Sequence, residues 1–99
     1  MGFKVLSELT SDEAFDLRDD LRLAVKGDDD GLSTLRYVQS DLDPQRYSVV
    51  FQGVAIGWVV RRTFDGRWMG YCSIGSSLCA DGLGTRKGAA VEVAWRFQR

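Results

Sequence analysis

The stretch RYSVVFQGVAIGWVVRRTFDGRWMGYCSIG, residues 46–75, decides the fold. It is rich in β-branched and aromatic residues and is interrupted by turn residues, a pattern typical of strands joined by short turns. Gln52-Gly53 fits a two-residue turn, and Asp65-Gly66 is a strong signal for a type I′ hairpin, which needs positive φ at both central positions. The sequence therefore predicts a three-stranded antiparallel meander over residues 46–51, 54–63 and 67–75.

Two-residue turns would divide the side chains of this meander between two faces, because side chains alternate along a strand. One face would be large and apolar: Tyr47, Val49, Phe51, Val54, Ile56, Trp58, Val60, Met69 and Tyr71. The other face would be smaller and partly polar, with Arg61 and Trp68 prominent on it. A one-residue bulge would exchange some of these assignments.

Helical spacing predicts one helix before the meander, from Thr10 to Lys26. Thr10 and Glu13 have capping-box spacing, and Gly27 provides a stop. The apolar stripe of this helix would be Ala14, Leu17, Leu21 and Ala24 or Val25.

A second helix is predicted after the meander, from Arg86 to about Gln98, with Thr85 as its N-cap. Its apolar stripe would be Ala89, Ala90, Val93, Ala94 and Phe97. We expect a single α+β domain over residues 1–99, of order α-β-β-β-α, with both helices packed on the apolar face of the sheet.

The remaining segments are less regular. Residues 28–31, DDDG, read as a solvated acidic loop, since the following Leu32 and Ser33 break the ligand spacing of an EF-hand. Residues 33–40 fit a short helical stripe without excluding other structures, and residues 76–83 read as a loop.

Charge is divided unevenly along the 99 residues, although the net charge is only −1. The acidic part, residues 1–43, holds five bases and eleven acids, and the basic part, residues 44–99, holds eight bases and three acids. Such a division favours contact with a polyanion through one part and an acidic interaction surface on the other. The alternative is that the two parts neutralise each other when packed.

Several classes of function are disfavoured. Histidine is absent, which removes imidazole-based catalysis and histidine-ligated metal sites, and we expect no enzymatic activity, metal or cofactor. Cys72 and Cys79 are expected to be free thiols, with a redox pair or a reactive thiol as the alternative. Without a long apolar run or a signal-peptide pattern, the chain is expected to be cytoplasmic and not to bind membranes.

Two groups of cations carry the functional prediction. In Gly82-Leu83-Gly84-Thr85-Arg86-Lys87, glycines, a cap and two cations begin a helix, where backbone amides and the dipole favour an anion such as a phosphate. The alternative is a simple loop and cap. Around the second hairpin, arginines flank a tryptophan, as on nucleic-acid-binding surfaces, or else that tryptophan covers a small cluster with Thr63 and Cys72. The predicted nucleic-acid contacts are Arg61, Arg62, Arg67, Trp68, Arg86 and Lys87.

Residues 53–95 resemble the AP2-type DNA-binding domain and the arm-binding domain of tyrosine integrases. The matching residues are Gly66-Arg67-Trp68, Ile74, Leu83-Gly84-Thr85 and Ala89-Ala90. The resemblance implies a three-stranded sheet backed by one helix, whose sheet face would read DNA through Arg61, Arg67 and Trp68. The order of elements and residues 84–89 are also similar to a double-stranded-RNA-binding domain.

We therefore expect a small non-enzymatic nucleic-acid-binding protein, a monomer or homodimer, with duplex DNA favoured and RNA as another ligand. The alternative is a protein-binding accessory or inhibitor module, of the kind that phages encode. It would contact a basic partner surface through the exposed acids of the first helix: Asp12, Asp16, Asp19 and Asp20.

Overall fold

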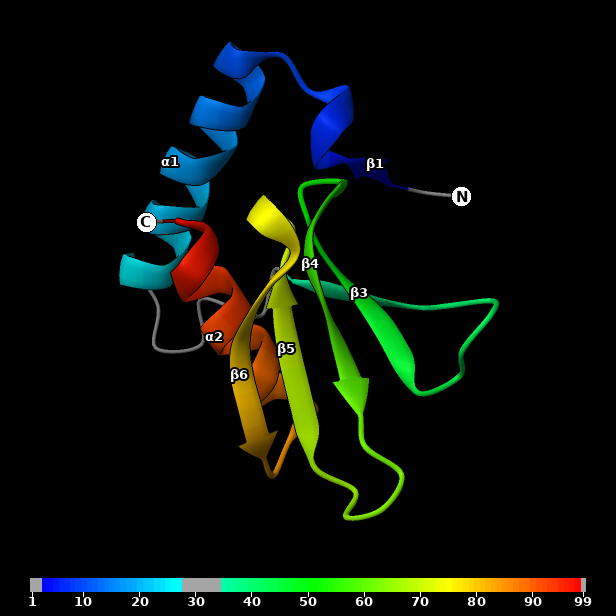
Figure 1. Cartoon of the computed structure of the whole chain (residues 1–99). Helices are drawn as coiled ribbons and strands as arrows, with labels where there is room; N and C mark the ends of the chain where they lie inside the picture. Colours follow the sequence, from blue (N-terminus) through cyan, green and yellow to red (C-terminus); the bar gives the residue numbers. More distant parts are fainter. Residues whose placement is uncertain (1–2, 28–34, 99) are drawn as a thin grey trace.

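A computed structural model describes residues 3–27 and 35–98 of the chain (Figure 1). The predicted acidic loop at residues 28–31, and residues 33–34 of the ambiguous segment, lie outside this range. The predicted α+β class is confirmed. The elements are β1 (Lys4–Val5), η1 (Leu6–Glu8), α1 (Ser11–Gly27), β2 (Arg36–Gln39), β3 (Arg46–Phe51), β4 (Val54–Arg61), β5 (Trp68–Cys72), η3 (Ile74–Ser76), β6 (Ser77–Leu83) and α2 (Arg86–Phe97).

The sheet is larger than the predicted three-stranded meander. Its order is β2-β3-β4-β5-β6, all antiparallel, and the short β1 pairs parallel to the start of β4. The meander is present as β3, β4 and β5, but it forms the centre of the sheet. The prediction of a loop over residues 76–83 is wrong, because β6 occupies most of that segment. The strand signal of this segment is weak, because β6 contains Asp81 and Gly82, which are poor strand formers, and pairs with β5 through two register shifts.

The two hairpin turns differ. The predicted two-residue turn at Gln52-Gly53 is confirmed, since Phe51 pairs with Val54, and both turn residues have positive φ, of 51° and 79°. The second turn is longer than predicted. Arg62 N donates to Arg67 O at 2.7 Å, which leaves a four-residue loop at residues 63–66, in which only Gly66 has positive φ. Asp65 instead accepts a hydrogen bond from Arg67 N, at 3.0 Å, and so closes the loop with its side chain.

A bulge in β4 reverses part of the predicted face assignment. Val50 pairs with Ala55 but Val49 pairs with Gly57, so Ile56 is an extra residue in β4. Beyond it, Val59 and the paired strand's Cys72 face the helices and are fully buried. The expected placement on the helix-covered face is therefore wrong for four half-buried residues of the opposite face: Trp58, Val60, Met69 and Tyr71.

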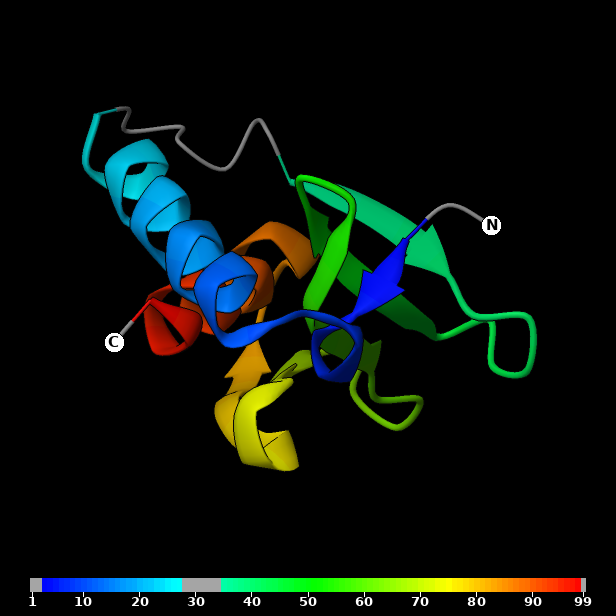
Figure 2. The same cartoon turned by 90° about the horizontal axis from the view of Figure 1, so that it is seen from above.

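Both helices lie on the same side of the sheet, as Figure 2 shows. In α1 the predicted capping box is present: Thr10 N donates to Glu13 Oε1 at 2.9 Å, and Glu13 N donates to Thr10 Oγ1 at 3.2 Å. Leu17 and Leu21 of its stripe are buried in the common core. In α2 the whole predicted stripe has no exposed surface: Ala89, Ala90, Val93, Ala94 and Phe97.

α2 approaches the sheet closely above two glycines. A Cβ on Gly57 would overlap the carbonyl oxygen of Tyr71 and would lie 2.5 Å from Val93 Cγ1. A Cβ on Gly70 would lie 2.9 Å from the carbonyl oxygen of Ala89 and 3.0 Å from Val93 Cγ2. Val93 therefore occupies the space that side chains at Gly57 and Gly70 would need, and this contact fixes the height of α2 above the sheet.

Candidate nucleic-acid interface

The six predicted contact residues come together at one end of the molecule. The β4–β5 loop lies beside the turn between β6 and α2, because Arg62 pairs with Asp81 and Arg67 binds the carbonyl oxygen of Gly82. Arg61 pairs across the sheet with Trp68. We call this region the basic end, and its members are Arg61, Arg62, Arg67, Trp68, Arg86 and Lys87.

Arg62 is committed to contacts within the protein. Its guanidinium contacts the carboxylates of Asp65 and Asp81, each at 2.7 Å, and lies 5.1 Å from the ring centre of Phe64. These contacts tie the β4–β5 loop to β6. The pKa of Asp65 is lowered, first by the hydrogen bond from the backbone of Arg67 and then by Arg62. Arg62 therefore contributes to the shape of the basic end, and two carboxylates offset its charge.

Arg61 and Arg67 are exposed on either side of this loop. Arg67 Nη1 donates to the carbonyl oxygen of Gly82 at 3.0 Å, which holds the side chain over the turn that leads into α2. The Arg61 side chain runs beside the loop, since a Cβ on Gly66 would lie 3.4 Å from Arg61 Nη2. Within the described part of the chain, neither residue forms an ion pair with a carboxylate.

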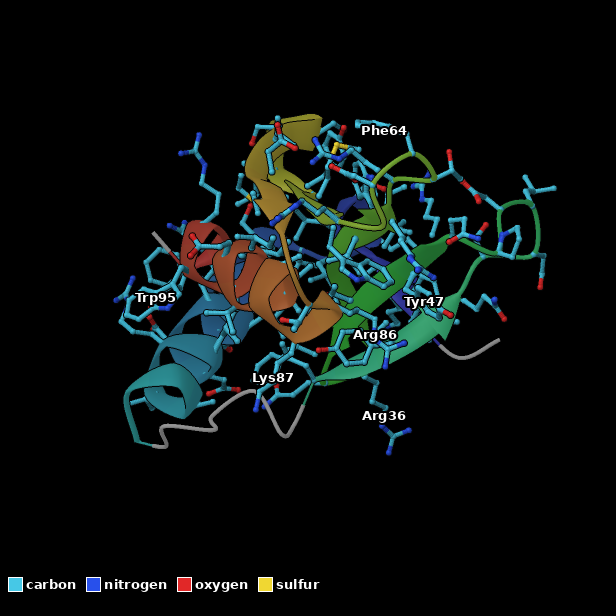
Figure 3. The ribbon with its side chains drawn as sticks, turned by 90° about the horizontal axis from the view of Figure 1, so that it is seen from below. Arg36, Tyr47, Phe64, Arg86, Lys87 and Trp95 are labelled. Atoms are coloured by element: carbon cyan, nitrogen blue, oxygen red, sulfur yellow. The ribbon has the colours of Figure 1, made fainter. Side chains whose placement is uncertain are left out.

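Arg86 lies in a cluster of aromatic rings. Its guanidinium carbon is 4.2 Å from the ring centre of Tyr37 and 4.9 Å from that of Tyr47, which are cation–π distances. Figure 3 shows Arg86 beside Tyr47, with Lys87, the next residue of α2, nearby and Arg36 extending away from both. Arg86 is half-buried and Lys87 is exposed. The site thus combines one fixed cation with one exposed cation at the start of α2.

The face assignment from two-residue turns placed Trp68 on the open sheet face, and this placement is wrong. Trp68 is half-buried on the helix side and packs against the core, and its ring centre is 6.0 Å from that of Tyr47. The bulge at Ile56 is the physical reason, because it turns the later side chains of β4 and β5 to the other face. Trp68 therefore supports Tyr47, which in turn supports Arg86.

The start of α2 has the predicted cap. Thr85 Oγ1 accepts a hydrogen bond from Gly88 N at 3.0 Å. This satisfies one of the unpaired amides of the first turn and explains Thr85 without a ligand. Phosphate contact at this helix start remains a prediction, and it depends on the neighbouring cations as well as on the helix.

The sequence did not indicate the aromatic partners of the cations. Tyr37 and Tyr47 hold Arg86, and on the opposite sheet face Arg46 lies 4.8 Å from the ring centre of Trp58. Trp58 also stacks on Tyr71, with ring centres 5.4 Å apart and an angle of 10° between the rings. The available signal was the alternation of arginine and aromatic residues, but their pairing depended on the bulge.

The four predicted acidic contacts, Asp12, Asp16, Asp19 and Asp20, are all exposed on α1. Asp19 lies 3.7 Å from Arg22 of the same helix. Two large apolar side chains on this helix are also exposed, Phe15 to 64% and Leu23 to 68%. The outer side of α1 therefore presents acids together with apolar side chains.

The two cysteines are free. Burial raises the pKa of both thiols, that of Cys79 to about 11, so neither is an activated nucleophile at neutral pH. Among the described residues, no group of three or more cysteines and carboxylates could hold a metal ion. No helix in the described ranges is long and apolar enough to cross a membrane.

Comparison of the chain with models of protein families, with curated proteins and with solved structures finds no significant match. The resemblance to AP2-type and integrase arm-binding domains therefore stays a prediction from the quoted residues.

Proposed function

We propose that this chain is a small nucleic-acid-binding protein without catalytic activity, and that the basic end is its contact surface. One observation supports the proposal: two segments distant in the chain, the residues around the β4–β5 loop and the start of α2, bring their cations to one end. Cations gathered on one side of a small domain are the electrostatic requirement for binding a polyanion.

The form of the basic end favours a duplex over a single strand. Binding of single strands relies on aromatic rings whose faces are free for base stacking. Here Tyr37 and Tyr47 face Arg86, and Trp68 is half-buried against Tyr47. The contacts left to the ligand are charges and hydrogen-bond donors, which suit the regular phosphates of duplex DNA or duplex RNA. Duplex DNA is the first choice because of the AP2-like residues.

Four cations would carry the binding. Arg61, Arg67 and Lys87 are exposed and would contact phosphates, and Arg86 would donate from a position that the tyrosine rings already hold. If each cation neutralises one phosphate, the slope of log K against log salt is about −3.6 for duplex DNA. Arg62 adds little to this slope because Asp65 and Asp81 pair with it.

The test is fluorescence anisotropy of labelled duplex DNA, duplex RNA and single-stranded DNA with the full chain, over a range of salt concentrations. We expect micromolar or tighter duplex binding at low salt, with a steep loss as salt rises. Absence of binding to all three ligands at low salt would refute the proposal.

A matched pair of single substitutions locates the contact. Lys87→Ala should weaken duplex binding and lower the salt slope by about 0.9. Lys4→Ala removes the same charge from β1, which pairs with Val54 at the opposite end of β4, and should leave the slope nearly unchanged. Equal effects of the two substitutions would show that binding follows net charge and does not depend on the basic end.

A second candidate function is a protein-binding accessory or inhibitor module that acts through α1. The observation in its favour is the exposure of Phe15 and Leu23 among the acids of α1, because apolar side chains ringed by charge are typical of protein interfaces. Phe15→Ser and Asp16→Lys should then abolish capture of a basic partner, whereas Lys87→Ala should not affect it.

A further inference from the structure

A groove lies between the edge strand β6 and helix α2. Its volume is about 390 Å³, and its main lining residues are Leu78, Ala80, Asp81, Glu92, Trp95 and Arg96. Leu78 is 51% exposed and Trp95 is 43% exposed. Figure 3 shows Trp95 on α2 well away from Arg86 and Lys87, so this groove is separate from the basic end.

The strand beside the groove is an unpaired edge. β6 pairs with β5 on one side, and no strand of the described ranges lies on its other side. An edge strand next to exposed apolar side chains is a template for pairing with another chain. The register shifts at Gly70 twist part of β6, but Ser77 and Leu78 keep regular pairing with Cys72 and Tyr71.

The charges that line the groove would complement those of the same groove on a second copy of the chain. Glu92 and Arg96 lie one turn apart on α2, with Trp95 beside them, and all three are exposed. Across a two-fold axis, if a residue of one copy contacts a second residue of the other copy, the reverse contact is also made. Two antiparallel copies of α2 would therefore place each Glu92 opposite an Arg96, with the two Trp95 side chains between these pairs.

We propose that this groove is the interface of a homodimer, in which a second copy of the chain packs antiparallel against β6 and α2 about a two-fold axis. The second copy covers Leu78 and Trp95 and supplies the opposite charge to Glu92 and Arg96. An unrelated partner would not need to carry the same glutamate–arginine spacing. The inference is independent of the proposed nucleic-acid binding.

The first test is sedimentation velocity of the full chain over a range of concentrations from about 1 to 500 μM. We expect a monomer–dimer equilibrium within this range. A chain that remains monomeric at the highest concentration would overturn the proposal. Species that grow beyond the dimer would also overturn it, since a two-fold interface closes.

Substitutions then locate the interface. Trp95→Glu should raise the dimer dissociation constant by about 100-fold or more, because it places a charge in the centre of the contact. Leu42→Glu, which alters a side chain that is 96% exposed in another part of the surface, serves as the matched control and should leave dimerisation unchanged. Circular dichroism and thermal melting report whether each variant is folded.

A charge exchange distinguishes this interface even if Trp95→Glu fails to fold. Glu92→Arg alone would place arginines opposite arginines at two symmetric positions, and should weaken the dimer by about tenfold. Arg96→Glu alone should have a similar effect. The double variant Glu92→Arg/Arg96→Glu restores opposite charges across the axis and should recover the wild-type constant. A double variant as weak as the sum of the single variants would refute the two-fold pairing.

Discussion

The substitution Gly57→Ala tests the close contact between α2 and the sheet. The new Cβ would overlap the carbonyl oxygen of Tyr71 and would lie 2.5 Å from Val93 Cγ1. A backbone carbonyl cannot rotate away as a side chain can, so strand or helix must move. Overpacking of a core commonly costs 1–3 kcal/mol, and we expect Gly57→Ala to cost about 3 kcal/mol because one of its clashes is with backbone. For a domain of this size the melting temperature should fall by roughly 12 to 24 °C.

The assay is urea unfolding followed by circular dichroism, with thermal melting as a second measure. Gly70→Ala should be milder, about 2 kcal/mol, because its nearest contacts are 2.9 Å to Ala89 O and 3.0 Å to Val93 Cγ2. Gly84→Ala is the control, since a Cβ there meets nothing within 4 Å and its φ is not positive. Combining Gly57→Ala with Val93→Ala should relieve only the side-chain clash.

A Gly57→Ala variant as stable as Gly84→Ala would refute this reasoning. It would show that α2 does not rest on Gly57, and that the height of the helix is set elsewhere. A loss of stability fully rescued by Val93→Ala would show that the carbonyl contact with Tyr71 is not tight.

Further predictions follow from the basic end and the cysteines. Trp68→Ala should cost about 2 kcal/mol in urea unfolding, since it removes a half-buried indole from beside Tyr47; no loss would place Trp68 outside the core. The pKa of Asp65 is lower in the folded protein than its ordinary value of about 4. The contribution of Asp65 to stability is therefore complete above that ordinary pKa and is lost as pH falls through the lower pKa of the folded state. Asp65→Asn should therefore flatten the acid side of the stability profile between about pH 5 and pH 2, and an unchanged profile would contradict this. With its pKa raised to about 11, Cys79 should react with iodoacetamide at about pH 8 more than 100-fold more slowly in the native protein than in urea, as measured by mass spectrometry; similar rates would show an accessible thiolate.

Local signals in the sequence were sufficient for the elements whose residues have strong preferences. The capping box of Thr10 and Glu13, the turn at Gln52-Gly53 and the apolar stripe of α2 were all predicted and are present. Each depends on residues within one or two turns of each other, so neighbouring sequence contains the required information.

The edge strands and the bulge could not be predicted in the same way. β1 and β2 are short, and β6 has weak strand preference, so their pairing with central strands stabilises them. The extra residue at Ile56 has no signal in the alternation of β4, because both faces of that strand carry apolar residues. Its position follows from tertiary packing, since Gly57 and Gly70 must lie beneath Val93.

The sequence predicts the residues of the candidate site, and the structure differs from that prediction in how two of them are placed. The cations of the second hairpin and of the start of α2 do lie at the same end. The sequence did not indicate that Arg62 would be paired with Asp65 and Asp81, or that Trp68 would be half-buried. These differences arise from contacts between segments that are distant in the chain, which spacing alone does not determine.

The bulge at Ile56 also bears on which changes in chain length this protein can tolerate during evolution. The four-residue loop shifts the pairing of β4 with β5 by two residues from that of a two-residue turn, and a shift of two leaves every side chain on its face. Gains or losses of residues in pairs at that loop should therefore be accepted. Deletion of Ile56 itself would place Gly57 directly after Ala55 and keep its pairing with Val49, so the later side chains of β4 and β5 would keep their faces, whereas deletion of one residue beyond the bulge would exchange the faces of the residues that follow it. Lineages of this fold should accordingly vary by pairs of residues at the loop and, within β4, should change in length at the bulge rather than beyond it.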